Sequence, residues 1–318
     1  IRPAIRVLPL LLSFAFIPAA VSAQAIAPPE ITATIVVHGF SSDGASRTGP
    51  FGVDIFDSTI SGLAGTIGLP LGTVAPAAPN QVAACDYYGA VPPAYYTAQD
   101  LADLQAADTQ YGGGVPRYAL IMAKFTRQVM ELSGATQVNI LGVSFGGLVS
   151  RYMVEKDVGG LVSSGKVARW IVIEGVVAGH WLASQGNPDL FDLYEGVIDV
   201  SSIDIQHMNY SWVSANLHNP PTDVDNPLLS QVQTHFWLAC DDEYNNRALT
   251  IASQKPNDGV VLLRDGFFHN VSTQSRHLGL RPTLGSIHAT HQSSKDHTGV
   301  RAGVAAELNG RRRATIML

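Results

Sequence analysis

Short apolar runs alternate along the chain with segments whose apolar residues recur at helical spacing. Six runs are rich in β-branched and aliphatic residues and predict strands: 31–37, 82–87, 137–141, 169–174, 233–239 and 260–263. Four segments have the helical period: 96–107, 117–132, 148–156 and 300–308. Strands that are apolar on both faces and alternate with helices predict an α/β fold, in which a mostly parallel sheet is covered by helices on both faces.

One long connection interrupts this alternation. Residues 177–230 separate the strands predicted at 169–174 and 233–239, and this segment contains five large aromatic residues: Trp181, Phe191, Tyr194, Tyr210 and Trp212. Connections between elements of a compact domain are usually about four to six residues long. The length therefore predicts a cap or lid insertion, and ordinary extra helices packed on the sheet are the alternative.

The composition is that of a compact protein with a sizeable core. Of 318 residues, 46% are hydrophobic and only 14% are charged, so little of the chain suits solvated, disordered tracts. Twenty Lys and Arg stand against 26 Asp and Glu, which gives a formal net charge of -6. Because this balance provides no basic face for phosphate backbones, we expect no nucleic-acid partner.

The first 23 residues have the pattern of a secretory signal peptide. Arg2 and Arg6 precede the apolar run 7–17, and the small residues Val21-Ser22-Ala23 follow. A membrane anchor, the alternative, needs about 20 unbroken apolar residues, but Pro18 ends this run early. We therefore expect a secreted protein, extracellular or periplasmic, whose mature chain, residues 24–318, forms one catalytic domain.

Two cysteines, Cys85 and Cys240, are present. In an oxidising compartment they allow a single intramolecular disulfide. Two buried free thiols are an equally ordinary arrangement, because free cysteine packs as a small apolar residue. The sequence leaves both alternatives open.

A Gly-x-Ser-x-Gly motif, Gly142-Val-Ser-Phe-Gly146, lies between the strand predicted at 137–141 and the helix predicted at 148–156. A strand, a tight turn and a helix in this order form the nucleophile elbow, which projects a serine above the sheet. The helix N-terminus also supplies backbone N–H groups for a developing oxyanion. A nucleotide-binding glycine turn is the alternative, but the chain has neither Gly-x-Gly-x-x-Gly nor Gly-Lys-Ser/Thr. Ser144 is thus the candidate nucleophile.

Two blocks resemble known enzymes. Residues 142–152, Gly-Val-Ser-Phe-Gly-Gly-Leu-Val-Ser-Arg-Tyr, resemble the elbow of bacterial lipases and related α/β hydrolases, and Val36-Val-His-Gly-Phe40 resembles their oxyanion loop. The resemblance implies an α/β-hydrolase fold and an oxyanion hole formed by the backbone N–H groups of Phe40 and Phe145. We interpret His38 as structural, because it precedes the serine and lies in the oxyanion segment.

A serine nucleophile needs a histidine to remove its proton and an acid to orient that histidine. In this fold the acid follows the serine in the chain and the histidine follows the acid. Asp258, in Pro256-Asn-Asp-Gly-Val-Val261, resembles the Asn-Asp-Gly block that carries the acid in bacterial lipases. Asp241 and Asp242, directly after the strand predicted at 233–239, are the alternatives.

The base is predicted from its place before the last helix. His297 immediately precedes the helical run 300–308, where this family usually carries the catalytic histidine. His291 and His288 lie in the same Ser- and Thr-rich loop and remain alternatives. The sequence thus predicts the triad Ser144, Asp258 and His297.

The predicted reaction is carboxylic ester hydrolysis through an acyl-enzyme, which needs no cofactor. Some lipases hold a structural calcium ion near the histidine, but Gly299 stands where they carry a carboxylate. We therefore expect no metal, although the acidic cluster 241–243 has oxygen ligands. The expected partner is a small-molecule or lipid ester, with transient contact to lipid surfaces, and the oligomeric state does not follow from the sequence. The alternatives are a deacylase of a glycolipid or polymer ester and a non-catalytic binding module.

Overall fold

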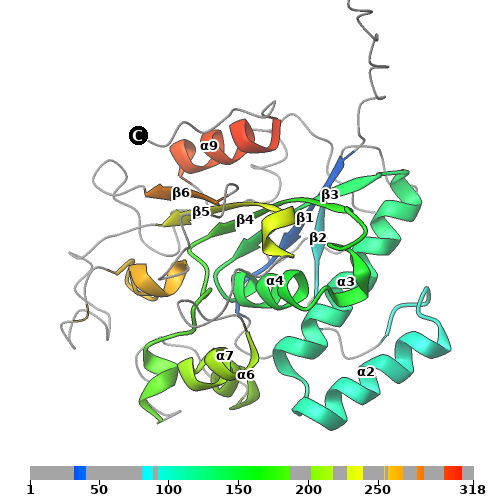
Figure 1. Ribbon diagram of the computed structural model, residues 1–318, viewed down its shortest axis with the longest axis horizontal. Coiled ribbons are helices and arrows are strands. Elements are labelled where there is room, and N and C mark those ends of the chain that lie inside the picture. The colour runs from blue at the N-terminus through cyan, green and yellow to red at the C-terminus, as the bar shows by residue number, and fades with distance from the viewer. Residues whose placement is uncertain are drawn as a thin grey trace, which may run out of the picture.

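The structure, a computed structural model, describes nine parts of the chain: residues 32–40, 81–88, 92–186, 202–217, 228–238, 254, 257–267, 278–282 and 297–309. Six parallel strands within these parts form one sheet, in the order β2-β1-β3-β4-β5-β6 (Figure 1). The strands are β1 (Thr32–Val37), β2 (Val82–Cys85), β3 (Gln137–Val143), β4 (Val167–Ile173), β5 (Gln233–Leu238) and β6 (Leu278–Pro282). This is the α/β sheet that the sequence predicts.

Helices cover both faces of the sheet, because the strands are apolar on both sides. On one face, Ile35, Ile140 and Val172 belong to the larger core cluster, together with residues of α3 (Gly114–Ser133) and α4 (Phe145–Glu155). On the other face, Val36 and Ile171 pack with the apolar side of α9 (Thr298–Asn309). Figure 1 shows α9 on one side of the sheet and α3 and α4 on the other.

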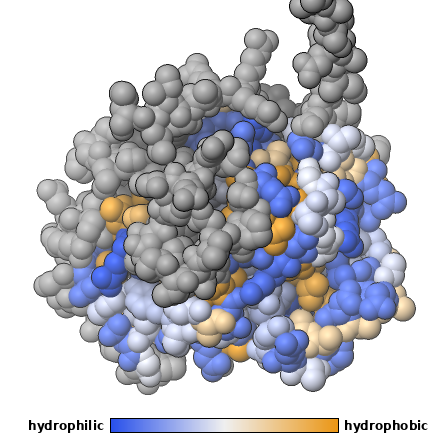
Figure 2. Space-filling model, viewed as in Figure 1, coloured by the Kyte–Doolittle hydropathy of each residue, from blue (hydrophilic) through white to orange (hydrophobic). Residues whose placement is uncertain are grey.

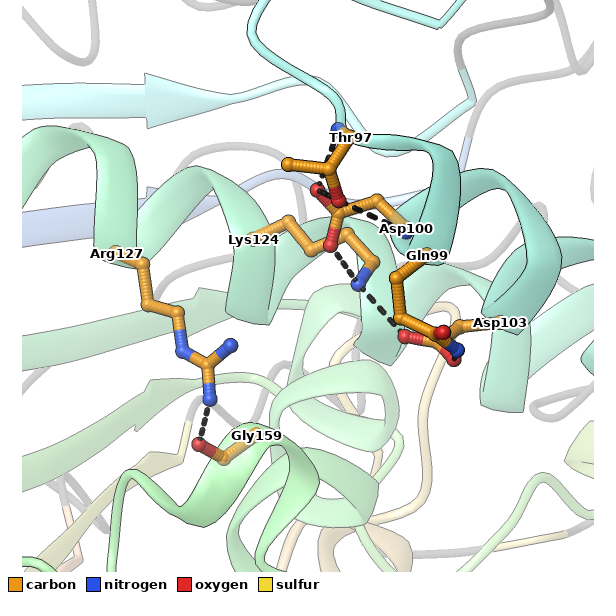
Figure 3. Close-up of polar contacts among 7 residues, drawn as sticks. All are labelled: Thr97, Gln99, Asp100, Asp103, Lys124, Arg127 and Gly159. Carbon is orange, nitrogen blue, oxygen red and sulfur yellow. Dashed lines mark hydrogen bonds and ion pairs between the residues drawn. The ribbon is translucent and has the colours of Figure 1, made fainter.

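Helix α2 (Ala98–Tyr111) is joined to α3 by a buried lysine. Thr97 caps α2 through a reciprocal capping box with Asp100, which satisfies two backbone donors of the first turn. The ammonium of Lys124 in α3 then donates to Asp100 (2.5 Å) and Asp103 (3.1 Å) (Figure 3). In the same view Arg127 donates to the carbonyl of Gly159 in η2 (Val158–Gly160). Helix α3 is thereby fixed to the two elements beside it.

The long connection after β4 is described in part. It contains η3 (Leu182–Gln185), α6 (Ser202–Met208), α7 (Tyr210–Asn216) and η4 (Leu229–Gln231). Ile205, Met208 and Val213 belong to the larger core cluster, and Trp212 stacks on Tyr152 of α4 at 6.2 Å between ring centroids. These helices therefore pack on the α3–α4 layer, and a lid made by the segment stays a prediction.

The prediction of a strand at 260–263 is wrong. Val260 and Val261 lie in an irregular loop that ends in η5 (Leu263–Gly266), and their backbone N–H groups donate to a side chain instead of a strand ladder. The last strand within the described residues is β6, Leu-Gly-Leu-Arg-Pro, which was not predicted from the sequence. Its glycine and terminal proline weaken the apolar strand pattern.

Cys85 is a buried free thiol at the end of β2. Its proposed partner Cys240 lies outside the described residues. Burial raises the pKa of the Cys85 thiol well above its ordinary value, and the neighbouring Asp86 carboxylate adds to the shift. Cys85 is therefore an apolar packing residue and not a reactive thiolate.

The described surface is mixed in polarity. On the face drawn in Figure 2, hydrophobic residues are interspersed with hydrophilic ones. Among the described residues, Leu101 of α2 is the large hydrophobic residue that is exposed. None of the described helices is both long and apolar enough to cross a membrane.

Candidate active site

Ser144 occupies a strained turn between β3 and α4. Its φ of 52° and ψ of −124° lie in a region that residues other than glycine rarely adopt. The residues from Leu141 to Val143 and from Phe145 to Ser150 are buried, whereas Ser144 is partly exposed. The turn therefore presents this side chain to solvent, as the elbow motif predicts.

The strained turn is held by its neighbours. The backbone N–H of Ser144 donates to the carbonyl of Ile173 (3.1 Å), and its carbonyl accepts from Gly147 (2.9 Å) and Val176 (3.0 Å). A Cβ at Gly146 would overlap the carbonyl oxygens of Val37 and His38, so only glycine fits there. The elbow thus packs directly against the end of β1.

The oxyanion loop predicted from the sequence lies beside Ser144. A Cβ at Gly39 would stand 3.0 Å from the Cβ of Ser144 and 3.5 Å from its Oγ. The ring of Phe40 meets that of Phe145 edge to face at 5.9 Å between centroids. Phe145 is the first residue of α4, and the first N–H groups of a helix lack an intrahelical partner. The two residues predicted to carry the oxyanion donors therefore contact each other beside the nucleophile.

Asp258 is buried, at 3% exposure, in the loop at the start of the described segment 257–267. Its Oδ1 accepts from the backbone N–H groups of Val260 (2.9 Å) and Val261 (2.7 Å). Asn257 caps the same turn by accepting from Gly259 (2.8 Å). The loop orients the Asp258 carboxylate rigidly, as a residue that orients a catalytic histidine requires. The alternatives Asp241 and Asp242 lie outside the described residues.

His180, which the sequence analysis missed, joins this acid loop to the segment after β4. It is 1% exposed, and its Nδ1 accepts from the backbone N–H of Leu182 (3.2 Å). Its Nε2 therefore carries the proton and donates to the carbonyl of Val260 (2.9 Å). Since the N–H of Val260 holds Asp258, His180 contributes indirectly to the position of that carboxylate.

His297 immediately precedes α9, as predicted, and is partly exposed. Its Nδ1 accepts from the backbone N–H of Gly299 (3.1 Å), and this is the contact that its ring makes within the described part of the chain. In a triad the same nitrogen donates to the acid. His297 would have to release Gly299 to serve as base, and His288 and His291 lie outside the described residues. The assignment of the base stays a prediction.

Glu174 is a second acidic residue at the carboxyl edge of the sheet that sequence reasoning missed. It follows β4, has a φ of 49°, is 2% exposed, and its backbone N–H donates to the carbonyl of Trp237 (2.8 Å). The sequence feature that could have identified Glu174 is its place directly after the apolar run Trp170–Ile173. Because β4 pairs with β3, the strand that leads to Ser144, Glu174 is a candidate site residue.

Two buried carboxyl groups join the helices of the long connection to the rest of the domain. Tyr88 donates to Asp204 of α6 (3.2 Å), and Tyr210 of α7 donates to Asp265 (2.7 Å). Burial raises the pKa of Asp204 to about 7, although hydrogen bonds from Tyr118 and Tyr88 partly offset the shift. Burial likewise raises the pKa of Asp265 to about 7, against the hydrogen bond from Tyr210.

These raised pKa values make a pH dependence of stability measurable. Between about pH 4 and pH 7 the folded state holds a proton on each of these carboxyl groups that the unfolded state has released. The stabilisation that the two groups give the folded state is therefore complete below about pH 4 and is lost as the pH rises through about 7. We expect Asp204→Asn to reduce the fall in unfolding free energy between pH 4.5 and pH 8 by roughly 1–3 kcal/mol. Urea unfolding at several pH values measures it.

The control for this prediction is Asp108→Asn, because the Asp108 side chain is 41% exposed and pairs with Arg117 at the surface. This variant should follow the parent protein at every pH. An Asp204→Asn variant whose pH profile parallels that of the parent would contradict the assignment of a buried proton to Asp204.

Within the described parts of the chain, no group of three or more His, Cys, Asp or Glu is arranged to hold a metal ion. The acidic cluster 241–243 lies outside them.

Comparisons with known proteins identify the fold. No protein-family model and no curated protein sequence matches the chain. Among solved structures, it is similar to the lipase BlEst2 of Bacillus licheniformis in its mature form, with 12% identity, a TM-score of 0.54, and coverage of 88% of this chain and 91% of that one. It is also similar to the metagenomic carboxyl esterase MGS0156, with 12% identity, a TM-score of 0.51, and coverage of 90% and 78%. The chain therefore has the α/β-hydrolase fold.

Proposed function

We propose that this protein of α/β-hydrolase fold is a serine carboxylic ester hydrolase with Ser144 as its nucleophile. The observation that carries the proposal is the strained backbone of Ser144 at the junction of β3 and α4, with Gly39 packed against its side chain. Backbone strain of this size persists only where surrounding structure enforces it, and it concentrates at functional sites. The two similar structures are a lipase and a carboxyl esterase, which supports the same reaction class.

In the proposed reaction, the hydroxyl of Ser144 attacks the ester carbonyl while a histidine takes its proton. The carbonyl oxygen becomes an oxyanion, which the backbone N–H groups of Phe40 and Phe145 stabilise. The histidine returns the proton to the leaving alcohol, and water then releases the acid from the acyl-enzyme. We assign the orienting acid to Asp258 and the base to His297, with His291 and His288 as the alternatives.

We propose an apolar acyl chain as part of the substrate. The ring of Phe40 is partly exposed and packs edge to face on the buried ring of Phe145, directly beside Ser144. An exposed aromatic ring next to a nucleophile suits a hydrocarbon better than a charged group.

The proposal is tested by labelling the purified protein with a fluorescent fluorophosphonate and by hydrolysis of p-nitrophenyl butyrate. We expect covalent labelling and multiple-turnover release of p-nitrophenol, because both need an activated serine. A folded protein that is neither labelled nor active on short- and medium-chain esters would overturn the proposal and favour a non-catalytic binding module.

Export is also part of the proposal. It rests on the sequence pattern of residues 1–23, which lie outside the described residues. We expect N-terminal sequencing of the protein recovered outside the cytoplasm to begin near Gln24. Recovery of a cytoplasmic protein that retains Ile1 would contradict the prediction.

A further inference from the structure

The peptide group between Gly39 and Phe40 carries one of the two proposed oxyanion donors, so its orientation matters for catalysis. A trans peptide is planar, and its C=O and N–H point in opposite directions. Whatever fixes the Gly39 carbonyl therefore also aims the Phe40 N–H. This peptide adjoins Ser144, because a Cβ on Gly39 would lie 3.5 Å from the Oγ of the serine.

Two side-chain groups hold the Gly39 carbonyl. The hydroxyl of Tyr87 lies 2.9 Å from it and 2.9 Å from the carbonyl of His38, so one phenolic proton is shared between two successive peptide groups. The Nδ1 of His38 lies 2.7 Å from the same Gly39 oxygen. Both groups thus fix the Gly39 carbonyl, and because the peptide is planar, the Phe40 N–H points the opposite way.

The pairing of β1 with β2 explains why Tyr87 reaches this place. The two strands run parallel with Val37 opposite Cys85, and the same register carried two residues further sets Gly39 opposite Tyr87. The ring of Tyr87 stacks on that of His38, with centroids 4.1 Å apart and planes 7° from parallel. Tyr87 is fully buried, so water does not compete for the two carbonyls.

We infer that Tyr87, assisted by His38, is a positioning residue that aims the Phe40 N–H at the oxyanion. Tyr87 does not touch the reacting atoms, and it acts through the carbonyl side of the donor peptide. The inference rests on the proposed esterase function. Packing in the core requires only the ring of this buried tyrosine, and the inference gives its hydroxyl a role in catalysis.

The test compares Tyr87→Phe with Tyr152→Phe. Both variants remove one buried tyrosine hydroxyl, and Tyr152 in α4 stacks on Trp212, away from the oxyanion loop. For p-nitrophenyl butyrate we expect Tyr87→Phe to lower kcat about 10-fold with KM within about twofold, because the lost orientation matters only when the oxyanion forms. Tyr152→Phe should keep near-parental kcat.

A transition-state analogue separates positioning from folding. A trifluoromethyl ketone forms a tetrahedral adduct with the serine, so its inhibition constant should rise in Tyr87→Phe by the same factor by which kcat/KM falls. Thermal unfolding of both variants is measured in parallel. Should Tyr87→Phe fail to fold, His38→Gln removes the ring nitrogen beside the Gly39 carbonyl and should give the same kcat-selective loss.

The outcomes separate the two proposals. If the parent protein neither hydrolyses the ester nor takes up the fluorophosphonate, the esterase function fails and the positioning role fails with it. If the parent is active and Tyr87→Phe matches Tyr152→Phe in kcat and in ketone inhibition, the positioning role alone is overturned. A loss in Tyr87→Phe that appears in KM, or only as a lower Tm, also overturns it.

Discussion

Replacement of Ser144 by alanine is expected to abolish fluorophosphonate labelling and to lower kcat for p-nitrophenyl butyrate at least about 10⁴-fold. Removal of a triad nucleophile leaves only the contribution of the oxyanion hole and substrate binding, so the loss is among the largest that one substitution causes. Alanine keeps a Cβ on the same strained backbone and does not alter the packing of Gly39 against it. Stability should therefore stay within about 1 kcal/mol of the parent.

The matched control is Ser163→Ala, which removes a serine hydroxyl from an exposed turn after η2. This variant should label and turn over at the parental rate. A Ser144→Ala variant that hydrolyses the ester as fast as the parent would show that the nucleophile lies elsewhere and would remove the central support of the esterase proposal.

The elbow turn at Ser144 could be predicted from the sequence because its signal is contiguous. β3, the turn and α4 lie within residues 137–155, and each has a local pattern: an apolar strand, two small residues around the serine, and a helical period. The structure places Ser144 in the strained turn that this order requires. The segment predicted as an oxyanion loop has an equally local signal, since it directly follows the apolar run of β1.

Features that depend on residues far apart in the chain were predicted less well. The acid loop contains Val260–Leu263, an apolar run that resembles a strand by itself, but its N–H groups bind the Asp258 carboxylate. In the sequence Tyr87 resembles any other core tyrosine. Its hydroxyl reaches the Gly39 carbonyl only because of the register of β1 with β2. His180 is equally inconspicuous, because its partner Val260 lies 80 residues further along the chain.

The catalytic base is the site residue that the sequence determines least, because a loop histidine has neither periodicity nor a rigid local motif. Comparison of His288→Ala, His291→Ala and His297→Ala resolves it. The variant that lacks the true base should lose several orders of magnitude in kcat, whereas loss of a surface histidine that makes no helix cap should cost little activity and at most about 0.5 kcal/mol of stability. We expect the large loss in His297→Ala.

The hydrogen bond from the Gly299 N–H to His297 gives this prediction a second measurable outcome. If His297 only caps α9 through its Nδ1, then His297→Ala should weaken the helix start by about 1 kcal/mol and leave kcat unchanged. A large kcat loss in His291→Ala or His288→Ala would then move the base upstream without altering the nucleophile.

If His297 is the base, the double variant with Ser144→Ala should be scarcely worse than Ser144→Ala alone, because nucleophile and base act as one unit. Full activity in all three single variants would contradict a base at any of these positions.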